Sequence, residues 1–110
     1  MSFSADGTRM VFASSGGYGR SGAASVWNAK TGTHLATISR LPYPKGAAQT
    51  GGAGTVDARL SPDGRRVLVR YVDDRLAEYD AGTGNLLKLR GKFSAADAGT
   101  ALERFAREGR

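Results

Sequence analysis

Apolar and polar positions alternate in short runs along most of the chain, and turn residues separate the runs. The stretch Arg66 to Val72 is rich in β-branched and aromatic residues, and its near-continuous apolar character predicts a strand covered on both faces. The acidic pair Asp73 and Asp74 supplies a hairpin turn into a second strand at Leu76 to Asp80. Short strands with turn signals at this spacing are typical of an all-β protein.

One unit of this pattern occurs twice. The chain reads FSADG at Phe3 to Gly7 and LSPDG at Leu60 to Gly64, and each is a turn in which Asp bonds the following backbone and Gly takes a positive φ. After each turn come an apolar strand, a hairpin, a strand ending in an aromatic residue, a Thr-Gly turn and a last strand. The interval from the aromatic residue to that glycine is five residues in both copies, Trp27 to Gly32 and Tyr79 to Gly84.

These elements resemble the WD repeat of β-propellers. The matching residues are Phe3-Ser4-Ala5-Asp6-Gly7 with Trp27-Asn28 and Thr31-Gly32, and Leu60-Ser61-Pro62-Asp63-Gly64 with Tyr79-Asp80 and Thr83-Gly84. In that family each repeat of ~40–45 residues forms a four-stranded blade, and ~4–8 blades close into a ring. The resemblance therefore implies an all-β fold of antiparallel β-sheets that form two consecutive propeller-like blades of an incomplete propeller. The residue pattern after Phe93 adds a short C-terminal α-helix.

The sequence departs from the family pattern in three respects, one of which is that the aromatic–acid pair is degraded to Trp27-Asn28 and Tyr79-Asp80. The usual Gly-His before the first strand is missing from both copies, and the only histidine, His34, lies elsewhere. The buried His-Ser/Thr-Asp-Trp network of typical blades is therefore not expected here. Glu78 stands where a buried branched apolar residue is expected, and a lone buried carboxylate is costly. Either this position is exposed or the blade is imperfect.

The chain is expected to divide into four segments. Residues 1–38 form a first WD-like blade whose first strand is truncated, and 39–55 form an inserted loop containing glycine and proline. Residues 56–93 form the second WD-like blade, and 94–110 form an amphipathic helix. Ser94 is the expected N-cap of this helix, and an apolar stripe recurs at helical spacing from Ala98 to Ala106.

Two long loops carry the candidate partner contacts. Tyr18 and Arg20 lie in the first hairpin loop, and Leu41, Tyr43 and Lys45 lie in the insertion between the two units. An aromatic ring between prolines and beside a cation favours a rigid contact patch. The alternative is that both loops are solvated and have no special role.

Catalytic, cofactor and metal sites are not expected. The chain has no cysteine and only one histidine, which excludes disulfides and thiolate metal sites. The G-x-G-x-x-G run at Gly17 to Gly22 precedes a predicted strand rather than a helix, so it is interpreted as a hairpin tip instead of a nucleotide site. The remaining notable residues are given structural roles: Asp6, Gly7, Asp63, Gly64, Asp73 and Asp74 as turn formers, and Trp27 and Tyr79 as blade aromatics.

The net charge and the lack of a membrane-spanning or signal segment indicate which kinds of partner are expected. The net charge is +6, but the basic residues are dispersed, so nucleic-acid binding is the weaker alternative. No apolar stretch approaches the ~20 residues of a membrane span, and no signal peptide is visible, which predicts a cytoplasmic protein that contacts no membrane.

The resemblance implies a non-catalytic scaffold for protein–protein interaction within a longer propeller, without a cofactor. Further blades in the same chain or self-assembly would complete the ring. The alternative is that this is the C-terminal propeller portion of a multidomain bacterial enzyme or signalling protein.

Overall fold

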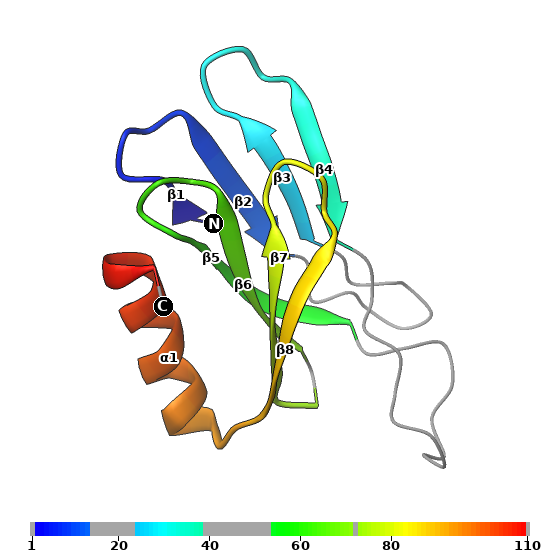
Figure 1. Cartoon of the computed structure of the whole chain (residues 1–110), viewed down its shortest axis with the longest axis vertical. Coiled ribbons are helices and arrows are strands. Elements are labelled where there is room, and N and C mark those ends of the chain that lie inside the picture. Colours follow the sequence, from blue (N-terminus) through cyan, green and yellow to red (C-terminus); the bar gives the residue numbers. More distant parts are fainter. Residues whose placement is uncertain (1, 14–23, 39–53, 72, 110) are drawn as a thin grey trace.

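Two antiparallel sheets and one helix form three layers (Figure 1). The computed structural model describes residues 2–13, 24–38, 54–71 and 73–109. The first sheet contains β1 (Ser2–Phe3), β2 (Arg9–Ala13), β3 (Ala24–Asn28) and β4 (His34–Ile38). The second contains β5 (Thr55–Leu60), β6 (Arg66–Tyr71), β7 (Arg75–Asp80) and β8 (Leu86–Lys92), and α1 (Ala95–Glu108) follows. The predicted fold class, two four-stranded blades and a C-terminal helix, is confirmed.

Each sheet is a simple meander in which every strand pairs with its neighbours in the sequence. Tight turns join most of the consecutive strands within the sheets, and a short connection can only join antiparallel neighbours. The main core lies between the two sheets and includes Val11, Val26 and Ile38 from the first sheet and Leu60 and Val69 from the second. The apolar residues of β6 project to both faces of the second sheet, as its near-continuous apolar run predicts.

Helix α1 covers the face of the second sheet that points away from the first (Figure 1). Its buried residues Ala98, Leu102 and Phe105 pack on Leu68 and Leu76 of the sheet. The helix ends are capped as well: the Ser94 hydroxyl accepts a hydrogen bond from the Asp97 amide at 3.2 Å, and Gly109 adopts a φ of 75° after the last turn. The central strands β6 and β7 of the second sheet are therefore buried on both faces.

The two copies of the repeated turn have the same hydrogen bonds. The Ser61 hydroxyl donates to the Asp63 carboxylate at 2.6 Å and accepts from the Arg66 amide at 3.1 Å. In the first copy, Ser4 makes the matching bonds to Asp6 at 2.7 Å and to Arg9 at 3.1 Å. Each serine thus joins its turn to the strand that follows.

These two turns also contact each other. The Ala5 amide donates to the Pro62 carbonyl at 3.0 Å, and the Arg9 guanidinium donates to the Gly64 carbonyl at 2.9 Å. Gly64 has a φ of +70°, and a Cβ added to it would lie 3.0 Å from the Cβ of Ser4. The two copies of the repeated turn therefore contact each other, and this contact places one sheet on the other.

Asn28 and Asp80 are the polar residues that follow the two blade aromatics, and each accepts hydrogen bonds from the turn after its strand. The side-chain oxygen of Asn28 accepts from the amides of Lys30 at 2.9 Å and Thr31 at 3.1 Å. The Asp80 carboxylate accepts from the equivalent amides, those of Gly82 at 2.8 Å and Thr83 at 3.0 Å. Only an acceptor oxygen is needed at this position, so Asn28 serves the turn as an aspartate would.

The structure rules out the first of the two alternatives for Glu78, an exposed position. Its side chain is not exposed, because the residue is only 6% accessible. It is not a lone charge either: its carboxylate accepts from Arg66 Nη1 at 3.3 Å and from Arg90 Nε at 2.5 Å. The prediction considered neither guanidinium, since they come from the strands on either side of Glu78. Glu78, an ion-paired carboxylate beneath α1, therefore stands where a typical blade has an apolar residue.

Candidate interaction surface

The described part of the chain contains no cluster of three or more His, Cys, Asp or Glu residues that could hold a metal ion. The one histidine lies at the surface, where His34 Nε2 is 2.9 Å from the Thr37 hydroxyl. Its ring meets the Trp27 ring edge-on with 5.0 Å between centroids. His34 and the half-buried blade aromatic Trp27 thus form a surface pair on the first sheet.

The carboxylates assigned to turns are held by local donors. Thr8 donates from both its amide and its hydroxyl to Asp6, and these bonds with the Ser4 hydroxyl lower the pKa of Asp6 to about 2. The Ser61 hydroxyl and the Arg65 amide likewise lower the pKa of Asp63. Gly7 follows Asp6 with a φ of +73°.

The second acidic turn also satisfies its own charges. Asp73 accepts from Arg75 Nε at 2.5 Å, and Asp74 accepts from Arg70 at 3.0 Å. Among the described residues, Asp74 is the only one other than glycine with a positive φ, 69°. Both carboxylates therefore hold the β6–β7 hairpin and its flanking arginines.

The other blade aromatic, Tyr79, is buried and hydrogen-bonded. Its hydroxyl lies 2.5 Å from the hydroxyl of Tyr71 on the adjacent strand. Burial raises the pKa of both phenols. This pair supplies polar contact inside the second blade, in place of the histidine network that is missing from both repeats.

The predicted partner contacts Tyr18, Arg20, Leu41, Tyr43 and Lys45 lie outside the described residues, as does the glycine-rich run 17–22. Those contacts stay predictions.

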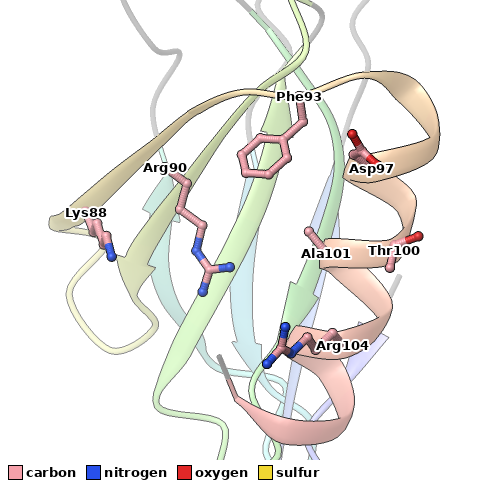
Figure 2. Close-up of a pocket in the computed structure, with 7 residues that line it drawn as sticks. All are labelled: Lys88, Arg90, Phe93, Asp97, Thr100, Ala101 and Arg104. Carbon is pink, nitrogen blue, oxygen red and sulfur yellow. The ribbon is translucent and has the colours of Figure 1, made fainter.

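A surface that the sequence did not predict lies between β8 and α1 (Figure 2). It is an open groove of about 520 Å³. Phe93 and Ala101 line it with apolar surface, and both pack against the core beneath the helix. Its polar lining residues are Lys88 and Arg90 from the sheet and Asp97, Thr100 and Arg104 from the helix. Three cations thus face one carboxylate.

Buried contacts fix the middle of this groove. Arg90 forms an ion pair with Glu78, and its guanidinium lies 5.6 Å from the centroid of the Phe105 ring. Arg66 approaches the same ring at 5.5 Å and also donates to the Gly109 carbonyl at the end of α1. These contacts therefore attach the helix to the sheet beneath the groove. Sequence reasoning missed it because no motif says that α1 packs over β5 and β6 and faces β8 across the sheet.

The outermost strand of the second sheet also exposes apolar side chains. Leu86, Leu87 and Leu89 are each about half accessible to solvent, at 51%, 53% and 49%. These are three of the six large apolar residues exposed in the described part of the chain. No helix among the described residues has the length and apolar character needed to cross a bilayer.

Comparison with known proteins identifies close relatives in sequence. Two WD repeat-containing proteins of Deinococcus radiodurans are 77% identical over 110 residues and 62% identical over 108 residues. These matches cover 100% and 98% of this chain but only 41% of each relative, so the chain spans well under half of their length. No protein-family model matches the chain.

Solved structures with the same fold are more distant in sequence. Hsv2 of Kluyveromyces lactis superposes with a TM-score of 0.51 over 88% of this chain and 23% of its own, at 16% identity. Hsv2 of Kluyveromyces marxianus gives a TM-score of 0.58 over 84% of this chain and 28% of its own, at 17% identity. At this identity the likeness concerns the fold, which is a β-propeller. The chain is therefore similar in sequence to WD repeat-containing proteins, and its two four-stranded sheets are similar in fold to blades of a β-propeller.

Proposed function

We propose that this chain is a non-catalytic scaffold segment that binds a protein partner, and that it works as part of a longer propeller. The observation that carries the proposal is the outer surface of the second blade. There, β8 carries three half-exposed leucines, and the same strand supplies Lys88 and Arg90 to the cationic groove beside α1. Exposed apolar side chains gathered on one element mark interaction sites more often than scattered ones do.

Placement within a longer propeller has separate support. The relatives continue beyond the matched segment, which is 41% of their length. In addition, the first sheet exposes Phe12, 42% accessible, on the residue next to the buried Val11. Successive residues of a strand point to opposite faces, so Phe12 points away from the second sheet. A further blade on that face would cover it as the second blade covers Val11.

Site-specific photo-crosslinking tests the proposal. The full chain carrying a photoreactive amino acid at Leu89 is irradiated in cells, and a matched protein carries it at Thr33, an exposed residue of the turn between β3 and β4. We expect a discrete protein adduct from position 89 and none from position 33. Equal labelling from both positions would contradict the proposal.

The two alternatives give different outcomes. Nucleic-acid binding predicts an affinity for DNA or RNA that falls steeply with salt concentration. Self-assembly predicts that the adduct at position 89 is a second copy of the chain, identifiable by its mass.

A further inference from the structure

We propose that the groove between β8 and α1 binds an acidic peptide segment of the protein partner, with its carboxylates at Lys88 and Arg104 and one apolar side chain on Phe93. This inference rests on the proposed function and names the chemistry of the partner. Figure 2 shows the three residues around the groove, with Lys88 on the strand and Arg104 on the helix.

The two rim cations are available to a ligand. Lys88 is exposed, and no carboxylate of the described residues forms an ion pair with it. Arg104 pairs with Glu108 at 3.4 Å, but the two side chains are 58% and 41% accessible. Water screens such a pair, so Arg104 can exchange Glu108 for an incoming carboxylate at little cost.

The third cation of the groove has a different role. Arg90 is committed to the buried carboxylate of Glu78, which Arg66 also contacts. Two guanidinium groups against one carboxylate leave this cluster with a net positive charge beneath the groove. The local field therefore favours an anionic ligand over a cationic one.

The single acid of the groove sets the direction of the ligand. Asp97 and Arg104 are seven residues apart in α1, which separates them by roughly 10 Å along the helix axis. Figure 2 shows them at opposite ends of the groove. An acidic segment is repelled at the Asp97 end and attracted at the Arg104 end, so its carboxylates lie toward Arg104.

An apolar side chain can occupy the other end. Phe93 and Ala101 form the rim of the apolar core under α1 and are only partly covered. The groove volume of about 520 Å³ falls within the ~300–1,000 Å³ typical of ligand sites. A few residues of an extended peptide fit this space, with the apolar residue on Phe93 and acids toward Lys88 and Arg104.

The partner is expected to dock through side chains and not as an added strand. Pairing of β7 with β8 shifts register twice, between Leu76 and Ala77 and between Glu78 and Tyr79. Lysines also occupy β8, at positions 88 and 92. Irregular pairing and lysines on an edge strand are the features that discourage further strand pairing.

Fluorescence anisotropy of labelled pentapeptides with the full chain tests the proposal. The probe has a phenylalanine at one end followed by four glutamates, and the control probes replace the glutamates with lysines or the phenylalanine with alanine. The variant is K88E/R104E. Its matched control K30E/K92E changes the net charge equally at exposed lysines that do not line the groove. Circular dichroism verifies that both variants are folded.

We expect the acidic probe to bind the wild-type chain and the lysine probe not to bind. At 0.1 M salt, where the Debye length is ~10 Å, K88E/R104E should weaken binding about tenfold or more, and K30E/K92E less than about threefold. Loss of the phenylalanine should weaken binding as well. The proposal is overturned if the acidic probe does not bind, if both double variants weaken it equally, or if K88E/R104E abolishes binding of a single-stranded oligonucleotide and leaves the peptide bound.

The crosslinking experiment separates this inference from the proposed function. If no partner is captured at position 89, the proposed function fails. If a partner is captured and is still captured by K88E/R104E, the scaffold function stands and only the acidic-peptide inference is wrong.

Discussion

Arg90 of β8 donates from Nε to the buried carboxylate of Glu78 on β7, with 2.5 Å between the two atoms. The Glu78 side chain is 8% accessible and that of Arg90 is 19% accessible, so this ion pair is largely removed from water. Removing one member of a buried pair leaves a charge without its partner, which costs more than the pair contributes. Arg66 contacts the same carboxylate at 3.3 Å and compensates in part.

Arg90→Met should therefore destabilise the chain by about 2–4 kcal/mol, and Glu78→Met/Arg90→Met should recover most of that loss. Urea unfolding followed by circular dichroism measures both. Arg104→Met, at an exposed pair, serves as the control and should cost less than ~1 kcal/mol. A double variant no more stable than Arg90→Met would contradict this account of the pair.

The repeated Thr-Gly turn provides a second, internally controlled comparison. Gly32 and Gly84 have φ values of +73° and +77°, so alanine is strained at either position. A Cβ on Gly84 would lie 2.7 Å from the Thr37 carbonyl of the first sheet, whereas a Cβ on Gly32 would meet nothing within 4 Å. Gly84→Ala should cost at least ~1 kcal/mol more than Gly32→Ala, which costs about 1 kcal/mol. Equal losses in thermal unfolding would show that the two sheets do not approach here.

The Tyr71–Tyr79 pair predicts a loss of stability at alkaline pH. Burial raises the pKa of both phenols above their ordinary value of 10.0. In the unfolded chain the phenols ionise near that value, while in the folded chain they stay neutral. Their contribution is therefore complete below pH 10 and declines as the pH rises above it. Tyr71→Phe should make this decline shallower, as measured by urea unfolding between pH 8 and 11, and an unchanged slope would contradict the prediction.

The hydrogen bonds of Asp6 predict that the fold loses stability at acid pH. The amide and hydroxyl of Thr8 and the hydroxyl of Ser4 lower its pKa from 3.8 to about 2. Because the folded-state pKa is the lower one, the carboxylate stabilises the fold above pH 3.8, and this contribution is lost as the pH falls toward 2. Carbon-13 NMR should find a midpoint near 2 for Asp6, and Asp6→Asn should remove this part of the acid dependence. A midpoint near 3.8 would show that the bonds from Thr8 do not persist in solution.

The repeated units and the helix could be predicted because local chemistry specifies them. The turns at Asp6 and Asp63, the strand pattern of β6 and the Ser94 cap depend on residues a few positions apart, so the sequence displays them directly. The same locality made the WD-type resemblance visible, since the repeat is defined by offsets such as that from Tyr79 to Gly84.

The groove and the buried charge could not be predicted in this way. Glu78 looked misplaced because its partners, Arg66 and Arg90, lie twelve residues away on either side and reach it only when three strands form a sheet. Lys88 and Arg104 likewise line one groove only because α1 packs on the second sheet and faces β8 across it. The sequence by itself determined the blades, since short-range turns and alternation encode each meander. The tertiary structure alone decided which charges meet, because long-range packing sets the distances on which ion pairs and binding surfaces depend.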